Sequence, residues 1–140
     1  MSQTNVKTGP VVFPCGEDLT DAADHLVVLS NNAGNPQIKL PTAQDDLAPY
    51  LILEGAGEGV DGSFQPLETR QNIRVPIVGT CNPGDTLVLA DPAVEGQSGK
   101  VEVLPSDPGT YRGVGIAEEL AVDGQLLLLR PLPLGVITVT

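Results

Sequence analysis

The sequence predicts an all-β fold, a compact β-barrel or β-sandwich, on three observations. The apolar residues occur in short runs rich in Val, Ile and Leu, and no window keeps the 3.6-residue period of an amphipathic helix. Turn-forming sequences, for example NPGD at 82–85 and DG at 123–124, separate these runs. The 16 glycines and 13 prolines lie between the runs, which is typical of a globular chain with many turns.

The first 24 residues differ from the rest and are predicted to form an extended N-terminal arm, 1–24. Gly9, Pro10, Pro14 and Gly16 interrupt any regular helix or central strand there. The arm contains a short apolar patch, which consists of Val11, Val12, Phe13 and Pro14. The remainder, 25–140, is predicted to be a β-rich body. Its candidate strands are 25–30, 37–40, 50–54, 63–68, 72–79, 86–90, 100–104, 111–117, 125–130 and 135–139.

Short motifs recur in the same order in the two halves of the body, at a nearly constant spacing. For example, LVVLS at 26–30 matches LVLAD at 87–91, and VDG at 60–62 matches VDG at 122–124. One interpretation is an internal repeat of two β-units, 25–70 and 85–133, joined by the strand at 72–79. The other is that β-proteins commonly reuse Leu-Val runs and Asp-Gly turns. Both interpretations stay open at the level of sequence.

The charge of the chain excludes several classes of partner. Eighteen acidic residues against seven basic ones give a formal net charge of −11, and no cluster of Lys and Arg offsets it. Because nucleic-acid backbones and anionic membranes would be repelled, we expect no direct nucleic acid and no membrane contact. The polar N-terminus lacks the apolar run of a signal peptide, and no run approaches the ~20 residues needed to span a bilayer. We therefore expect synthesis in the cytoplasm.

Residues capable of catalysis or metal binding are few. The one histidine, His25, and the two cysteines, Cys15 and Cys81, are too few for a structural zinc site. A Cys15–His25 pair would be a thiol nucleophile with its base, whereas a surface histidine beside acidic residues is the simpler interpretation. The G-x-G-x-x-G sequence at 57–62 is followed by Pro66, which breaks the helix that a dinucleotide site requires. We expect no catalytic, cofactor-binding or metal site and no enzymatic activity; whether the cysteines pair is open.

The second half carries a recognisable order of elements over residues 72–132. A strand follows NPGD at 82–85, another begins at Gly99, and then come GVGIA at 113–117, DGQ at 123–125 and a closing strand. This order resembles that of the small β-rich decoration, or cement, proteins on the heads of tailed bacteriophages. The resemblance implies a structural virion protein that binds the outer surface of a mature capsid and stabilises the head. Its partners would be the major capsid protein and itself, as a homotrimer at threefold or quasi-threefold positions.

The resemblance also assigns a role to each end of the chain. The arm, through Val11, Val12, Phe13 and Pro14, would bind a neighbouring capsid or cement subunit by adding a strand to its sheet. The alternating stretch at 136–139 would be an aggregation hazard if its edge stayed unpaired. Val136, Ile137 and Val139 are therefore predicted to form a subunit contact, or to pair with the N-terminal region.

A second class of function stays open beside this one. A β-sandwich binding module on a virion, for carbohydrate or for adhesion to a host surface, would need exposed aromatic side chains in a groove. The candidates for that groove are Tyr50, Phe64 and Tyr111. Exposure of these three side chains would favour the module over the decoration protein.

Overall fold

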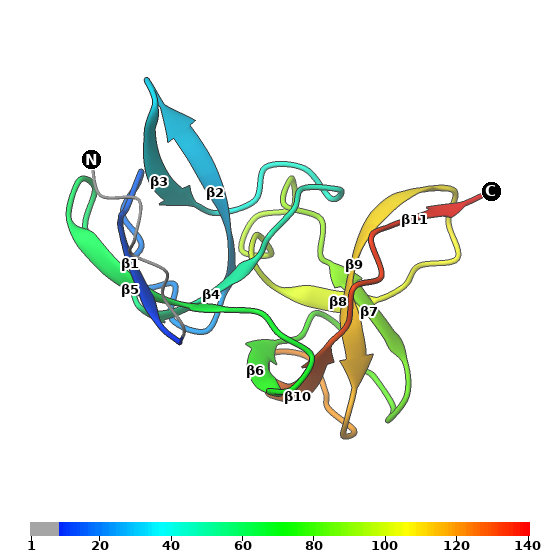
Figure 1. Cartoon of the computed structure of the whole chain (residues 1–140). Helices are drawn as coiled ribbons and strands as arrows, with labels where there is room; N and C mark the ends of the chain where they lie inside the picture. The colour runs from blue at the N-terminus through cyan, green and yellow to red at the C-terminus, as the bar shows by residue number, and fades with distance from the viewer. Residues whose placement is uncertain (1–8) are drawn as a thin grey trace.

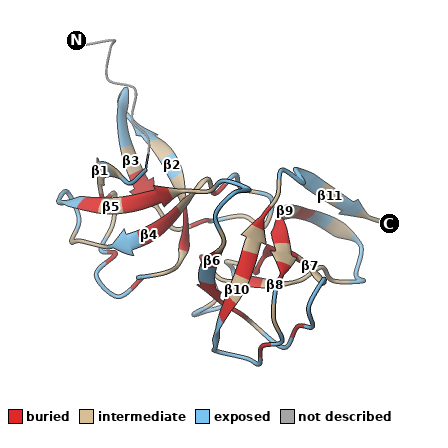
Figure 2. Cartoon of the chain, turned by 60° about the horizontal axis from the view of Figure 1, so that its bottom comes forward, coloured by how far each residue is buried: buried red, intermediate tan, exposed pale blue. Residues whose placement is uncertain are grey.

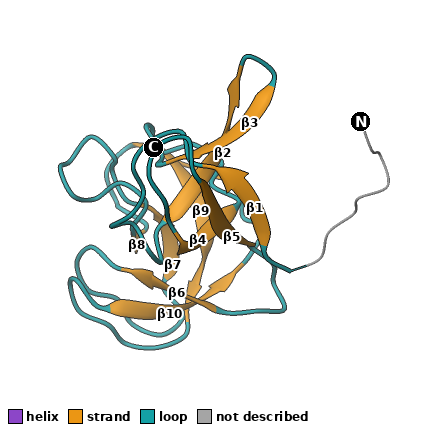
Figure 3. Ribbon diagram, turned by 90° about the vertical axis from the view of Figure 1, so that its left-hand side faces the viewer, coloured by secondary structure: helices purple, strands orange, loops and turns teal. Residues whose placement is uncertain are grey.

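The computed structural model describes residues 9–140, and these residues form strands and loops (Figures 1 and 3). No helix that could cross a membrane occurs in the described part of the chain. The strands are β1 (Val11–Pro14), β2 (Leu26–Asn32), β3 (Asn35–Lys39), β4 (Tyr50–Glu54), β5 (Asp61–Pro66), β6 (Ile73–Pro76), β7 (Thr86–Leu89), β8 (Val101–Val103), β9 (Gly109–Ala117), β10 (Leu126–Pro131) and β11 (Val136–Val139). The predicted all-β class is confirmed.

The strands build two sheets with the same order. The first runs β1-β5-β4-β2-β3 and the second β6-β10-β9-β7-β8, with β11 pairing to β9 outside this path. Each sheet curls until its two end strands meet, through a parallel bridge between Cys15 and Ile38 in the first and between Ile77 and Val101 in the second. The chain therefore consists of two small barrels, which we call the first unit (β1–β5) and the second unit (β6–β10).

The two units also share their hydrogen-bond register. In the first unit the Asp24 N–H donates to Ile52 O at 2.9 Å, and at the equivalent place in the second the Gly84 N–H donates to Ala117 O at 2.8 Å. Three further bonds from a backbone N–H to a carbonyl oxygen recur in the same way. Written as donor to acceptor, first unit and then second unit, they are Cys15 to Val60 and Ile77 to Gln125, Leu19 to Ala56 and Cys81 to Ala121, and Leu67 to Pro49 and Leu132 to Val114. Each unit begins one strand earlier than the predicted boundaries of 25–70 and 85–133, because β1 and β6 complete the barrels.

Both units have buried segments in their strands (Figure 2), and their cores use equivalent positions. In the first unit Phe64 faces inward from β5, and in the second Leu129 occupies the matching place on β10; both side chains are fully buried. The remaining matched pairs, all buried, are Cys15 with Ile77, Leu19 with Cys81, Val27 with Leu87, Ile38 with Val101, and Ile52 with Ala117. The core side chains of the two barrels thus come from equivalent positions in their strands and connections.

The arm prediction is wrong for residues 9–24, which belong to the first unit. β1 pairs antiparallel with β5, from Val11 opposite Phe64 to Pro14 opposite Asp61. The residues after β1 are also held in place, since Leu19 is completely buried and Ala22 nearly so. The two prolines that suggested an irregular arm precede and end the strand, where a missing N–H costs no central ladder bond. Residues 1–8 of the predicted arm lie outside the described residues.

The two units pack on each other through a mixed junction. From the first unit Leu26, Ala48 and Leu51 join the hydrophobic core of the second. The Leu26 N–H donates to Gly99 O at 2.7 Å, and Ser98 Oγ donates to Pro41 O at 2.7 Å. A Cβ on Gly99 would come within 3.0 Å of the chain at residues 25, 26 and 40, so this close approach requires glycine. The junction is therefore a tightly fitted contact and not a flexible linker.

Candidate functional site

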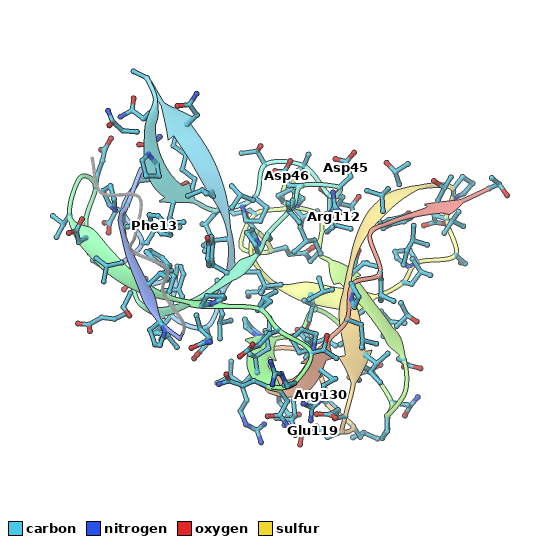
Figure 4. All side chains as sticks on the ribbon, in the orientation of Figure 1. Phe13, Asp45, Asp46, Arg112, Glu119 and Arg130 are labelled. Carbon is cyan, nitrogen blue, oxygen red and sulfur yellow. The ribbon has the colours of Figure 1, made fainter. Side chains whose placement is uncertain are left out.

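The four residues predicted to bind a capsid through an arm lie in the wall of the first barrel. Phe13 (labelled in Figure 4) packs against Tyr50 with ring centroids 5.6 Å apart and against Phe64 with ring centroids 6.5 Å apart. Of the four, only Val12 is exposed, at 57%. Since β1 already pairs with β5 along its whole length, it cannot also leave the barrel to add a strand to a partner without breaking that pairing.

The residues predicted to form a subunit-contact edge lie together on β11. This strand pairs with the beginning of β9, Val136 opposite Arg112 and Val139 opposite Gly109, and projects from the second unit (Figure 1). Val136 is 48% exposed, whereas Ile137 and Val139 are half-buried. Within residues 9–140, β9 is the one strand that pairs with β11. Its outer edge is thus open to a further strand, whereas closure of the barrels pairs the end strands of both sheets.

A second projection, which the sequence analysis did not single out, is the β2–β3 hairpin. Its pairing continues beyond the barrel to Asn32 opposite Asn35. The two residues of the turn, Ala33 and Gly34, have φ of 51° and 90°, the pattern of a type I′ turn. Asn31 Oδ1 accepts a hydrogen bond from the Gly34 N–H at 2.6 Å and stabilises the turn. The Asn-rich sequence at 31–35 was the available signal for this hairpin.

A cleft of about 250 Å³ opens at the junction of the two units. Apolar side chains line most of it, from Leu47, Pro49, Leu67, Leu132 and Leu134. At its rim the Arg112 guanidinium donates from Nη2 and Nε to Asp45 O at 3.0 and 3.2 Å (Figure 4). Among residues 9–140, no aromatic side chain lines the cleft. Its residues come from three connections and from β9, which lie far apart in the sequence, so no local motif could have predicted it.

The aromatic residues expected in a carbohydrate groove are mostly internal. Phe64 is completely buried and Tyr111 is 6% exposed, while Tyr50 is half-buried beside Phe13. The Tyr111 hydroxyl donates to Asp107 O at 2.9 Å, in the connection that precedes β9. The expectation that Phe64 and Tyr111 could form an exposed binding platform is therefore wrong, because both rings are buried in the protein.

The cysteines and the histidine do not form a reactive pair. Cys15 and Cys81 are both free and buried, and they belong to the cores of different units. Burial raises the pKa of the Cys81 thiol. A hydrogen bond from the Ala121 backbone opposes this rise in pKa, and the nearby carboxylates of Asp85 and Glu119 add to it. His25 Nδ1 lies 3.0 Å from Ala23 O, so the ring contacts its own connection. Among the described residues no group of three or more His, Cys, Asp or Glu is placed to hold a metal ion.

The acidic charge is distributed unevenly between the two units. Residues 9–71 contain ten acidic and two basic side chains, whereas residues 72–140 contain eight acidic and four basic ones. In the second unit two ion pairs form, Arg74 with Glu119 at 2.8 Å and Arg130 with Glu118 at 3.1 Å. Hydrogen bonds from Asn72 and Arg130 lower the pKa of Glu118. The first unit is therefore the more strongly negative of the two.

Comparison with known proteins identifies the fold. No protein-family model and no curated protein matches the chain. A solved structure described as the head fiber gp8.5 N base in bacteriophage phi29 is similar, with a TM-score of 0.63 and 21% sequence identity over 88% of this chain and 92% of that chain. Because the match covers 88% of this chain, it includes both barrels. The resemblance to phage head proteins that the sequence suggested is thus found again in the fold, in a protein of a phage head.

Proposed function

We propose that this chain is a structural protein of a bacteriophage virion, a decoration or cement protein that binds the outer surface of the head and stabilises it. The observation that supports this most is the likeness of its fold, over nearly the whole of both chains, to the base of a phage head fibre. Fold alone does not dictate function, so the proposal depends on a direct binding test.

The architecture suits such a role physically. The hydrophobic core of the second unit includes residues of the first, so a force applied to one unit is transmitted to the other. Most strand edges are closed inside the barrels, which limits accidental strand pairing at the high local density of a capsid surface. The net charge of −11 keeps unbound copies soluble.

In this proposal the partners are the major capsid protein and further copies of the same chain. The chain would be made in the host cytoplasm and would assemble as a homotrimer at threefold or quasi-threefold positions of the capsid. Its role needs no catalysis, cofactor or metal, and no direct contact with nucleic acid or membrane. Several weak contacts per trimer would bind the shell with avidity.

Co-sedimentation of the purified protein with empty mature shells of its phage tests the proposal. We expect saturable binding at a fixed ratio to coat subunits, and bound shells that break at a higher temperature than bare ones. Immature shells and an unrelated protein of similar negative charge are the matched controls. A folded protein that does not bind mature shells would overturn the decoration role.

A variant that lacks residues 1–8 separates two modes of attachment in the same assay. The deletion ends before β1 and leaves the first barrel complete. Much weaker binding by this variant would assign the remaining part of the predicted arm to the capsid contact. Unchanged binding would place the contact on the described body. If the full chain fails to bind shells but binds a glycan array, the binding-module alternative replaces the proposal.

A further inference from the structure

Two ribbons project beyond the closed barrels. The hairpin ribbon is the outer part of β2 and β3, residues 30–37, and the β11 ribbon is β11 with the start of β9, residues 136–139 and 109–112. In Figure 1 the first rises at the upper left and the second extends to the right, so they lie on opposite sides of the molecule. Such an arrangement allows a head-to-tail contact, in which the hairpin ribbon of each copy meets the β11 ribbon of the next.

Both ribbons avoid the negative charge that is spread over the rest of the chain. No charged residue occurs at 30–38 or at 131–140, and no acidic residue occurs at 108–117, although the chain contains 18 acidic side chains. Two copies with a net charge of −11 repel each other over most of their surface. They can approach through these two ribbons without placing carboxylates against one another.

The contact between the two units within the chain indicates how these surfaces fit. In the second unit the β7–β8 connection, 90–100, packs on the first unit through Ser98 and Gly99. In the first unit the facing surface is the β3–β4 connection, whose Pro41 O accepts a hydrogen bond from Ser98 Oγ at 2.7 Å. Its Gln44 O also accepts a hydrogen bond from the Arg112 N–H, at the start of β9, at 2.9 Å. The two units have the same barrel fold, but each contributes a different side of that fold to the junction.

Because the barrels share one topology, the surface that each unit contributes to the junction has a counterpart in the other unit. Those two counterpart surfaces take no part in the junction. The counterpart of the β7–β8 connection is the turn of the hairpin ribbon, between β2 and β3. The counterpart of the β3–β4 connection is the stretch at 104–108, which leads directly into the β11 ribbon. The free outer edge of β11 and the amide side chains of Asn32 and Asn35 are both able to form hydrogen bonds across such a contact.

We propose that the hairpin ribbon of one copy docks on the β11 ribbon of the next copy, head to tail, and so repeats between chains the contact that joins the two units within a chain. A heterologous contact of this kind generates a closed ring when its rotation closes. The inference deepens the proposed homotrimer and rests on it, since it names the surfaces by which the copies meet.

Single negative charges on the two ribbons test this contact. Thr138 on β11 and Asn35 on β3 are both exposed, so Thr138→Asp and Asn35→Asp add a charge without disturbing a core. We expect each to weaken self-association at least tenfold, measured as molar mass against concentration by sedimentation equilibrium. Gln71→Asp, on the exposed linker between the units, is the control and should associate like the unmodified chain. Thermal unfolding of each variant verifies that it is folded.

The same variants distinguish head-to-tail docking from a twofold contact. If β11 pairs with β11 of a second copy, Thr138→Asp dissociates the protein but Asn35→Asp does not, and the inference is overturned. A chain carrying both Asn35→Glu and Thr138→Lys places opposite charges across the proposed contact and should recover association. Failure of that recovery would also overturn it. An unmodified chain that is monomeric at all concentrations but still binds shells would refute this contact while leaving the decoration role intact.

Discussion

The first barrel holds a cluster of three aromatic rings beside its aliphatic core, Phe64 with Phe13 and Tyr50, whereas the core of the second is built of aliphatic side chains and Cys81, although both have one strand order and one register. On β5 of the first unit Gly62 and Phe64 face inward, and on β10 of the second unit Leu127 and Leu129 occupy the matching places. A Cβ on Gly62 would lie 3.0 Å from Phe64 Cζ, so the ring of Phe64 extends into the space that Leu127 takes in the second barrel. Between the two units, two positions on this strand thus differ in how they share side-chain volume, while the barrel stays the same.

A second exchange occurs on the neighbouring strand. Tyr50 on β4, which pairs with Pro66, corresponds to Gly115 on β9, which pairs with Pro131. A Cβ on Gly115 would collide with the carbonyl of Arg130, whereas Tyr50 has room to pack on Phe13. Barrel closure and hydrogen-bond register therefore define this fold, while the identity of the core residues varies as long as total volume is kept.

The largest expected effect comes from emptying the barrel cores. Phe64→Ala removes a completely buried ring from the first unit and should cost about 3–5 kcal/mol of unfolding free energy, and Leu127→Ala in the second about 2–5 kcal/mol. Chemical denaturation monitored by circular dichroism measures both. A cost below about 1 kcal/mol for either variant would contradict the described core.

The exchange of volume between Gly62 and Phe64 can be measured separately by a double-mutant cycle. Gly62→Ala should destabilise the unmodified protein, because the new methyl group would lie 2.9 Å from the Glu54 carbonyl oxygen, 3.0 Å from Phe64 Cζ and 3.1 Å from Cys15 Sγ. In a Phe64→Leu background the same substitution should cost less, with a coupling of about 0.5–3 kcal/mol. Additive costs would show that the two positions do not share space.

An intermediate effect is expected at the two matched backbone positions with positive φ. Gly84 has φ of 90° and its counterpart Asp24 has φ of 65°. Gly84→Ala should cost about 1–2 kcal/mol, because a Cβ is strained in this region. Asp24→Gly should change stability by less than about 0.5 kcal/mol, since relief of strain is offset by the greater freedom of glycine in the unfolded chain. Thermal or chemical denaturation measures both, and equal costs at the two sites would contradict this asymmetry.

The smallest effect concerns a charge at the junction. Lys39 on β3 corresponds to Glu102 on β8. Burial and then the nearby Asp91 raise the pKa of Glu102 above its ordinary value of 4.5, against a hydrogen bond from Gln44. The folded state therefore prefers the protonated acid, and stability is lost as pH rises through the folded pKa. Glu102→Gln should raise Tm at pH 7 by about 1–2 °C and have no such benefit below pH about 4.

Glu118 provides the control of opposite sign. Hydrogen bonds from Asn72 and Arg130 lower the pKa of Glu118, so its ionised form stabilises the folded state above the ordinary pKa and this contribution disappears as pH falls. Glu118→Gln should therefore lower Tm at pH 7 and have little effect in acid. Differential scanning calorimetry across this pH range measures both variants, and equal signs for the two would contradict the assigned causes.

Short-range features of the sequence determined most of the strands. Runs rich in Val, Ile and Leu, separated by Gly, Pro, Asn and Asp, predicted every strand from β2 to β11. The recurring motifs indicated a repeat, but VDG at 60–62 and at 122–124 are not equivalent in the structure. The Cys15 N–H bonds to Val60 O and the Ile77 N–H to Gln125 O, so the two motifs lie three positions out of register. β1 was missed because Pro10 and Pro14 resemble an irregular arm when strand pairing is unknown. The stretch at 136–139, predicted as a contact edge, forms β11, which pairs with β9 and leaves its outer edge unpaired; the hairpin ribbon and the junction cleft were not predicted.

The positions of strands and turns follow from local sequence, because the alternation of side chains and the turn residues act over a few positions. Which strands meet depends on contacts between segments that lie far apart in the chain. The bridge from Cys15 to Ile38, which closes the first barrel, joins segments on either side of β2, and the contact of Leu26 with Gly99 joins the two units. Pairing between such distant segments depends on how all the strands share one core and one set of backbone hydrogen bonds, and no single segment of sequence carries that information.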